Sequence, residues 1–427
     1  MTDLQRPDCV ALDAADPLAP LREQFVLPDG VIYLDGNSLG ALPRATASRV
    51  QTVVADEWGQ GLIRSWNTAG WIDLPQQVGN KIARLVGAAP DELVVTDSTS
   101  INLYKVLSAA LTIARADAPQ RRVIVSEREN FPTDLYIAQS LAAQHGCQLE
   151  LVEQGRAVDR LRDDVAVLLL TQVNYRSGAL YDMAAVTAAA HAAGALTIWD
   201  LAHSAGALPI DLNGAQADFA IGCGYKYLNG GPGAPAFVWV HARHVNRVPQ
   251  PLAGWHGHAA PFVFTPDYQP AAGIARYLCG TPTLLSLAAL ECGVDTVLAA
   301  EPLGGMQALR RKSVALSDLF IRLVDARLHA HPLAVATPRD ARQRGSQVAL
   351  RFDGDGYAVM QALIDRGVIG DFRAGDKTRG DADLLRFGFT PLYLRHVDVF
   401  DAVQTLREVL DSGIWRDARF ARKGAVT

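Results

Sequence analysis

ALTIWDLAH at residues 195–203 and DFAIGCGYKYL at residues 218–228 are the two stretches that decide the fold. Each begins with an apolar run of the length of a buried strand, and each run ends in polar residues. Asp200 closes the first run, and Tyr225 and Lys226 follow the second. Apolar runs of this kind that alternate with helical patterns are typical of a mostly parallel sheet covered by helices on both faces.

The rest of the chain repeats this alternation. Four further apolar runs read as strands: Leu93–Thr96, Arg122–Ser126, Val165–Thr171 and Phe237–Val240. Apolar residues recur at helical spacing over three segments between them: Ile101–Ala114, Thr133–His145 and Ala184–Ala193. After a largely helical region that begins near residue 281, two more strands are expected, at Gln347–Phe352 and Leu384–Phe387.

We therefore expect an α/β protein with two folded units. The larger unit would hold a mostly parallel, seven-stranded type of sheet between helices, and the smaller unit would be an α+β domain. Residues 1–60 would form an N-terminal arm and part of the small domain. Residues 61–300 would form the large domain and residues 301–427 the C-terminal small domain.

Composition and charge argue against several classes of function. The 427 residues carry a formal net charge of −5, which gives no attraction to nucleic acid or to an anionic membrane. No apolar run approaches the ~20 residues that span a bilayer. The five cysteines are scattered without a CxxC or Cys/His cluster, so we expect no metal site. Residues 1–10, MTDLQRPDCV, lack the basic and apolar regions of a secretory leader, so we expect a cytoplasmic protein.

Residues that could bind a ligand follow four of the predicted strands, at the edge where open α/β sheets bind ligands. They are Asp200, Lys226, Phe131 and the Thr99-Ser100 pair that opens a helix. Alone, each has an ordinary explanation as a turn former, a solvated lysine, a packed ring or a helix cap. Together they meet the needs of pyridoxal phosphate (PLP): an amine for its aldehyde, a carboxylate for its ring nitrogen, an aromatic cover and a helix N-terminus for its phosphate.

Six short motifs along the chain narrow this interpretation. They are LDGNSLG (34–40), NFPTD (130–134), DLAH (200–203), YKYLN (225–229), GWHGH (254–258) and RFGFTPLY (386–393). In this order they resemble the kynureninases, a branch of the aspartate-aminotransferase-like superfamily of fold type I PLP enzymes. The resemblance spans nearly the whole chain, and it makes the larger unit the PLP-binding domain. It implies hydrolysis of L-kynurenine to anthranilate and L-alanine in tryptophan catabolism and NAD biosynthesis, by a homodimer with shared active sites.

The resemblance also implies roles for single residues. Lys226 would be the Schiff-base lysine, Asp200 and Asp134 would lie at the pyridine nitrogen, and Tyr225 would be either an acid–base group or only a phosphate ligand. The implied catalytic residues are thus Lys226, Tyr225 and Asp200. The implied cofactor-binding residues are Thr99, Ser100, Phe131, Pro132, Thr133, Asp134, Thr171, Asp200, His203, Tyr225, Lys226, Trp255 and Thr281. Arg386 would pair with the substrate carboxylate, because a guanidinium matches a carboxylate bidentately, and the implied substrate-binding residues are Arg386, Asn37, Ser38 and Trp66.

Two positions depart from the animal members of that family. Gly280-Thr281 stands where those members have a Ser-Asn pair near the substrate's aromatic ring, which suggests that 3-hydroxykynurenine is a poorer substrate than kynurenine. Thr99-Ser100 replaces a Leu-Thr pair at the phosphate. Backbone donors tolerate such a change, so the phosphate site is still expected.

Three alternatives stay open from the sequence. A PLP-dependent transaminase on the same scaffold would share the early steps of the reaction. A cysteine desulfurase is disfavoured, because it needs a nucleophilic cysteine late in the chain and none follows Cys292. A non-enzymatic PLP-fold binding protein is disfavoured by the intact pair of Asp200 and Lys226 and by the lack of a basic tail.

Overall fold

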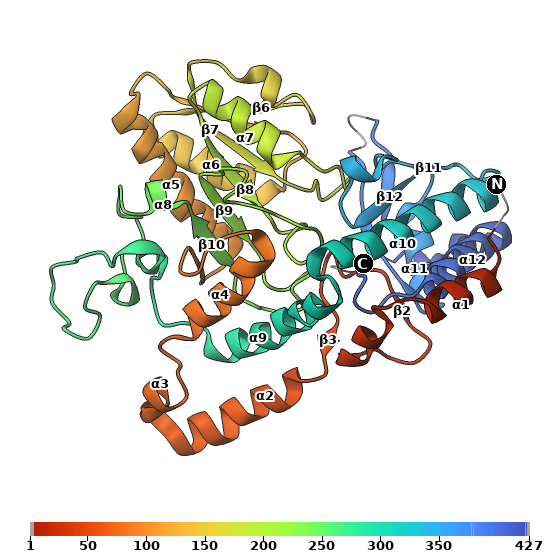
Figure 1. The fold of residues 1–427 in the computed structure, drawn as a ribbon. Helices are drawn as coiled ribbons and strands as arrows, with labels where there is room; N and C mark the ends of the chain where they lie inside the picture. The colour runs from red at the N-terminus through yellow and green to blue at the C-terminus, as the bar shows by residue number, and fades with distance from the viewer. Residues whose placement is uncertain (1–3, 377, 379, 423, 425–427) are drawn as a thin grey trace.

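A seven-stranded sheet lies at the centre of the larger part of the molecule (Figure 1). The computed structural model describes residues 4–376, 378, 380–422 and 424. The strands follow the spatial order β4 (Leu93–Val95), β10 (Phe237–Val240), β9 (Phe219–Gly222), β8 (Leu196–Asp200), β7 (Val165–Thr171), β5 (Val123–Glu127) and β6 (Gln148–Val152). Strands β9, β8, β7, β5 and β6 run parallel, whereas β10 is antiparallel to both β9 and β4. The expected mostly parallel, seven-stranded sheet is confirmed.

Strand β7 shows why its sequence is apolar without alternation. Val167 and Leu169 belong to the core on one face of the sheet, and Leu168 and Leu170 belong to the core on the other face. Because helices cover both faces, every position of the strand is buried. The first core includes residues of α5 (Thr99–Asp117) and α6 (Pro132–His145), and the second includes residues of α4 (Leu74–Val86), α7 (Met183–Ala192) and α9 (Leu284–Leu298).

Strand β6 is the one member of this sheet that the sequence pattern does not predict. Its residues read QLELV, and all five are exposed or only partly buried. It lies at the edge of the sheet, where only one neighbour, β5, pairs with it. An edge strand does not need an apolar side chain at every position, so the signal that marks the central strands is missing.

The smaller part of the molecule contains a four-stranded antiparallel sheet of β11 (Leu333–Val335), β12 (Gln347–Phe352), β15 (Asp383–Gly388) and β14 (Asp371–Arg373). Its helices are α10 (Gly305–Arg327), α11 (Gly356–Ile364) and α12 (His396–Ser412). The N-terminal helix α1 (Arg6–Ala14) lies beside α12 in Figure 1, and Asp13 accepts hydrogen bonds from the backbone of His396 and Val397. The N-terminal arm therefore packs with the small domain, while the domain boundaries themselves stay a prediction.

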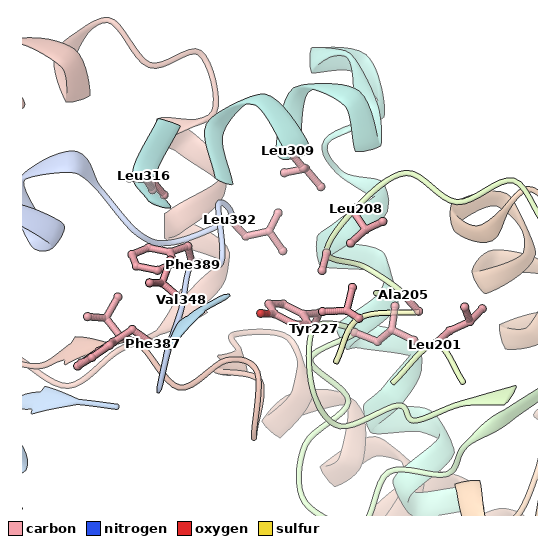
Figure 2. Close-up of a cluster of buried hydrophobic side chains, with 14 of the residues drawn as sticks. Leu201, Ala205, Leu208, Tyr227, Leu309, Leu316, Val348, Phe387, Phe389 and Leu392 are labelled. Carbon is pink, nitrogen blue, oxygen red and sulfur yellow. The ribbon is translucent and has the colours of Figure 1, made fainter. Parts of the chain in front are cut away.

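A shared hydrophobic cluster joins the two parts around Tyr227, the residue that follows Lys226 in the chain (Figure 2). Tyr227 lies in the middle of this cluster, between Leu201 and Leu208 of the large domain and Val348 and Leu392 of the small domain. Its ring is almost wholly buried, and its hydroxyl donates to the carbonyl oxygen of Ser346 at 3.1 Å. The residue after Lys226 is thus held by both domains.

Two segments project from the body of the molecule in Figure 1. One runs from α2 (Thr46–Thr52) through a π-helix (Val53–Gly61) to α3 (Ser65–Thr68). The other is the loop between α8 (Ala242–Val245) and α9. Within the described part of the chain, no helix combines the length and the apolar character that a membrane span requires.

Candidate active site

A pocket of about 600 Å³ opens at the carboxyl ends of the parallel strands. Most of the residues that the sequence nominates for the cofactor line it. They are Thr99, Ser100, Phe131, Thr133, Asp134, Thr171, Asp200, His203, Tyr225 and Lys226, joined by Ser98, Tyr175 and Ala202. Pro132 begins α6 next to them. Parallel strands bring these residues together because all of their carboxyl ends meet at one edge of the sheet.

Two carboxyl groups lie at the floor of this pocket. Asp200 ends β8, Asp134 stands in the first turn of α6, and both side chains are buried. Burial and the neighbouring Asp200 raise the pKa of Asp134 well above its usual range, and burial raises the pKa of Asp200. The two groups lie within hydrogen-bonding reach of each other, and like charges so close together disfavour ionisation of both. Asp134 Oδ2 has no hydrogen-bond partner among the described residues, so a cationic N–H donor between the two groups would satisfy both.

Lys226 presents its amine to the same pocket. Its Nζ lies 2.9 Å from His203 Nε2, 5.9 Å from the ring centre of Phe131 and 5.7 Å from that of Tyr225. The loop that carries it is closed by hydrogen bonds from Asn229 N to Lys226 O and from Gly40 N to Tyr225 O. A Cβ at Gly40 would overlap Lys226 O, so glycine is required for this close approach.

His203 is buried between the amine and the small domain. Burial, together with the charges of Lys226 and Arg386, holds its pKa well below the usual value. The imidazole is therefore neutral at physiological pH. Its Nδ1 lies 3.0 Å from Oε1 of Gln347, the first residue of β12.

The opposite end of the pocket is the N-terminus of α5. Ser98 caps this 19-residue helix and accepts a hydrogen bond from Ile101 N at 3.4 Å, and Thr99 and Ser100 form its first turn. Unpaired backbone N–H groups and the helix dipole make such a terminus a binding site for a phosphate group. Tyr225 lines the same pocket, and burial raises its pKa, so its hydroxyl remains protonated.

Arg386 lies just behind the pocket, in β15. It donates to the carbonyl oxygen of Tyr175, a residue that lines the pocket, and to Ser38 Oγ at 3.2 Å, and it forms an ion pair with Asp371. The side chain is almost wholly buried, and burial lowers its pKa to about 10. Its Nε is buried and has no hydrogen-bond partner among the described residues.

Comparison with known proteins identifies the family. Residues 309–406 match the model of the kynureninase C-terminal domain. A kynureninase of Burkholderia mallei (strain SAVP1) and one of Pseudomonas fluorescens are each 57% identical to this chain over 425 residues, which is 99% of either chain. The chain belongs to the kynureninase family.

Two solved structures share the fold at lower identity. A cysteine desulfurase from Thermococcus onnurineus NA1 superposes with a TM-score of 0.76 at 19% identity, over 96% of this chain and 100% of the other. A mutant of C-DES with glycine covalently linked to its PLP cofactor superposes with a TM-score of 0.77 at 17% identity, over 91% and 99%. At such identities the likeness shows the fold alone.

Seven of the nominated residues do not line the pocket of their own chain: Asn37, Ser38, Trp66, Pro132, Trp255, Thr281 and Arg386. The ring of Trp66 lies 6.1 Å from that of Trp255, and the ring of Trp255 stacks on that of His256 at 4.9 Å. These rings belong to the region around the projecting segments. Asn37 is wholly buried beside Gly388, and neither atom of its amide finds a hydrogen-bond partner in the described part of the chain.

The structure adds residues that the sequence does not nominate. Tyr175 comes four residues after the end of β7, so a search for residues that follow the strand ends could have found it. Its ring meets that of Phe131 edge-on at 5.4 Å. Gln347 gives no such signal, because it begins a strand of the other domain and reaches His203 only through the three-dimensional packing.

Proposed function

We propose that this protein is a PLP-dependent enzyme that hydrolyses L-kynurenine to anthranilate and L-alanine in tryptophan catabolism. The observation that carries the proposal is the buried pair Asp134 and Asp200 in one pocket with the amine of Lys226. The full-length relatives at 57% identity bear the name kynureninase, which selects this activity among those of the fold.

The residues present fit pyridoxal phosphate. The bound cofactor supplies an aldehyde that links covalently to an amine and a protonated pyridine ring that withdraws electrons. Lys226 Nζ is the amine that would hold the aldehyde, and the N-terminus of α5 would hold the phosphate. Asp134 Oδ2 has no hydrogen-bond partner among the described residues, and burial raises the pKa of both carboxyls, which supports a place for the protonated ring nitrogen beside them.

Each of these side chains has a task in the reaction. Asp200 would keep the proton on the pyridine nitrogen by accepting it in a hydrogen bond. Phe131 would cover one face of the ring and exclude water from it. Lys226 Nζ, when it is a free amine, would take the proton from the substrate Cα. Tyr225, whose hydroxyl is protonated, would donate either to the phosphate or to the carbon that becomes the methyl group of alanine.

The overall reaction consumes one water molecule. The bond between Cβ and the γ-carbonyl carbon of kynurenine breaks. The oxygen of water becomes part of the carboxylate of anthranilate, and Cβ gains a proton to give alanine. Arg386 would hold the α-carboxylate, with Ser38 at its side.

We propose further that the active form is a homodimer in which each pocket receives residues of the second copy. Trp66, Trp255 and Thr281 lie away from the pocket of their own chain. The segments that neighbour them expose large apolar side chains: Trp58 is 59% exposed, Ile63 77% and Phe264 76%. A second copy of the chain would cover this surface.

The proposal also covers the preferred substrate, the location of the protein and its lack of nucleic-acid binding. Thr281 favours kynurenine over 3-hydroxykynurenine as the substrate. The net charge of −5 and the five free cysteines support a cytoplasmic protein that binds no nucleic acid.

A direct assay separates this function from its alternatives. Purified protein is mixed with PLP and L-kynurenine, and anthranilate is followed by fluorescence and alanine by chromatography. Equal amounts of anthranilate and alanine support the proposal. Formation of the keto acid of kynurenine without anthranilate identifies a transaminase, and bound PLP without turnover of kynurenine identifies a different role.

A further inference from the structure

Gln347 lies at the junction of the two domains and is wholly buried. Its Nε2 donates to the carbonyl oxygen of Tyr175 at 2.9 Å and to that of Asn174 at 3.3 Å. Its Oε1 lies 3.0 Å from His203 Nδ1. All three partners belong to the large domain, so a single side chain of the small domain ties together the walls of the pocket.

The surroundings of Gln347 fix which way its amide points. Backbone carbonyl oxygens only accept hydrogen bonds, so the two carbonyls of Tyr175 and Asn174 must face the NH₂ group. The Oε1 atom, which carries no hydrogen, is then left for His203. A hydrogen bond between Oε1 and Nδ1 therefore requires the proton to be on Nδ1 of His203.

This assignment determines the state of the other ring nitrogen. A neutral imidazole carries one proton, so Nε2 of His203 is a bare acceptor. Nε2 lies 2.9 Å from the amine of Lys226, which is a donor. In the other tautomer, an N–H on Nε2 would point at the amine, and the lone pair of Nδ1 would face the lone pair of Oε1.

We propose that Gln347 is a positioning residue that holds His203 in the Nδ1-protonated tautomer, so that Nε2 accepts from the reactive amine of Lys226. The same amide binds the carbonyl of Tyr175, to which Arg386 also donates. Gln347 thereby connects the amine with the arginine that would bind the substrate carboxylate. The expected effect of Gln347 on turnover rests on the proposed function, whereas the expected tautomer of His203 does not depend on it.

Two variants separate the functions of the amide. In Gln347→Leu, all three hydrogen bonds of the amide are lost, so His203 loses its tautomer preference. In Gln347→Glu, a carboxylate oxygen still accepts from Nδ1, so the tautomer is retained, while the second oxygen faces the carbonyls of Tyr175 and Asn174. Gln250→Leu is the matched control. Gln250 is also buried with its amide bound to backbone groups, of Leu252 and Arg276, but it does not contact His203.

The tautomer is measured by ¹⁵N NMR of the protein labelled at histidine nitrogens, with and without bound PLP, and the His203 signals are assigned with a His203→Asn variant. We expect a protonated Nδ1 in the wild type, in Gln347→Glu and in Gln250→Leu, and mixed protonation in Gln347→Leu. The kcat for kynurenine should fall about 10- to 100-fold in Gln347→Leu, the range found when a residue that orients a functional histidine is removed. In Gln347→Glu, KM should rise more than kcat falls.

A wild-type His203 with its proton on Nε2 would overturn the proposal, and so would an unchanged tautomer in Gln347→Leu. Equal losses of kcat in Gln347→Leu and Gln250→Leu would reduce the role of Gln347 to stability and would overturn it as well. If the wild-type protein forms no anthranilate, the proposed function fails, but the NMR signals still decide the role of Gln347.

Discussion

Replacing Asp35 with asparagine should make the protein more stable, and increasingly so as the pH rises. Asp35 lies in the loop between Leu34 and Gly40 and is largely buried, and its Oδ1 has no hydrogen-bond partner in the described part of the chain. Burial raises its pKa from 3.8 to about 6, although Ser38 and the charges of Arg386 act in the opposite direction. The folded protein therefore holds this proton more tightly than the unfolded chain does.

The size of the effect follows from the two pKa values. The contribution of the Asp35 carboxyl to the free energy of unfolding is fully present below the unfolded pKa of 3.8. This contribution is lost as the pH rises through the folded pKa of about 6. The difference between the two values corresponds to a loss of about 3 kcal/mol at pH 8 and about 1 kcal/mol at pH 4.5. The partial exposure of the side chain reduces both figures. Asparagine has nearly the shape of the protonated aspartic acid and stays neutral at every pH, so the variant avoids this loss.

The assay is urea unfolding of wild type and Asp35→Asn at one protein concentration, at pH 4.5, 6 and 8. The gain in stability should grow between pH 4.5 and pH 8. Asp29→Asn, at an exposed position of the same arm, should change stability by less than about 0.5 kcal/mol at each pH. A gain that is the same at all three pH values, or a less stable Asp35→Asn at pH 8, would show that the carboxyl is not held protonated by burial.

Three further predictions concern the site itself. Asp200→Asn should lower kcat/KM for kynurenine at least about 100-fold, because an amide cannot keep the proton on the pyridine nitrogen; near-normal steady-state rates would contradict the role of Asp200. Arg386→Lys should raise KM more than it lowers kcat, because lysine lacks the fork that binds a carboxylate with two hydrogen bonds; an unchanged KM for kynurenine would place the carboxylate elsewhere. Co-expressed Lys226→Ala and Trp66→Ala chains with different tags should recover about a quarter of the wild-type activity, since half of the dimers are mixed and each mixed dimer has one intact pocket; two inactive single variants that stay inactive together would refute shared pockets.

The sequence predicts those parts of the molecule whose signals are local. Strands β7 and β8 are buried on both faces, so their residues form unbroken apolar runs, and the polar residue at the end of each run falls at the pocket. Asp200 and Lys226 were therefore accessible from the pattern alone. Their neighbours Asp134 and His203 came from the resemblance to a family rather than from spacing.

The features that the sequence does not predict depend on contacts between distant segments of the chain. Strand β6 is half-exposed at an edge and lacks the apolar run. Gln347 meets His203 across 144 positions of the chain, and nothing near Gln347 marks it. The raised pKa of Asp35 arises from burial, which no motif records. The positions of Trp66 and Trp255 away from the pocket also appear only once the chain is folded.

The most direct test of the central claim follows L-kynurenine with the PLP-loaded wild type and with Lys226→Ala side by side. The wild type should release anthranilate and alanine in equal amounts. Lys226→Ala should form neither at a measurable rate and should lose the visible absorption of PLP bound through an amine. Unchanged kynurenine with the loaded wild type, or equal turnover by both proteins, would contradict the account.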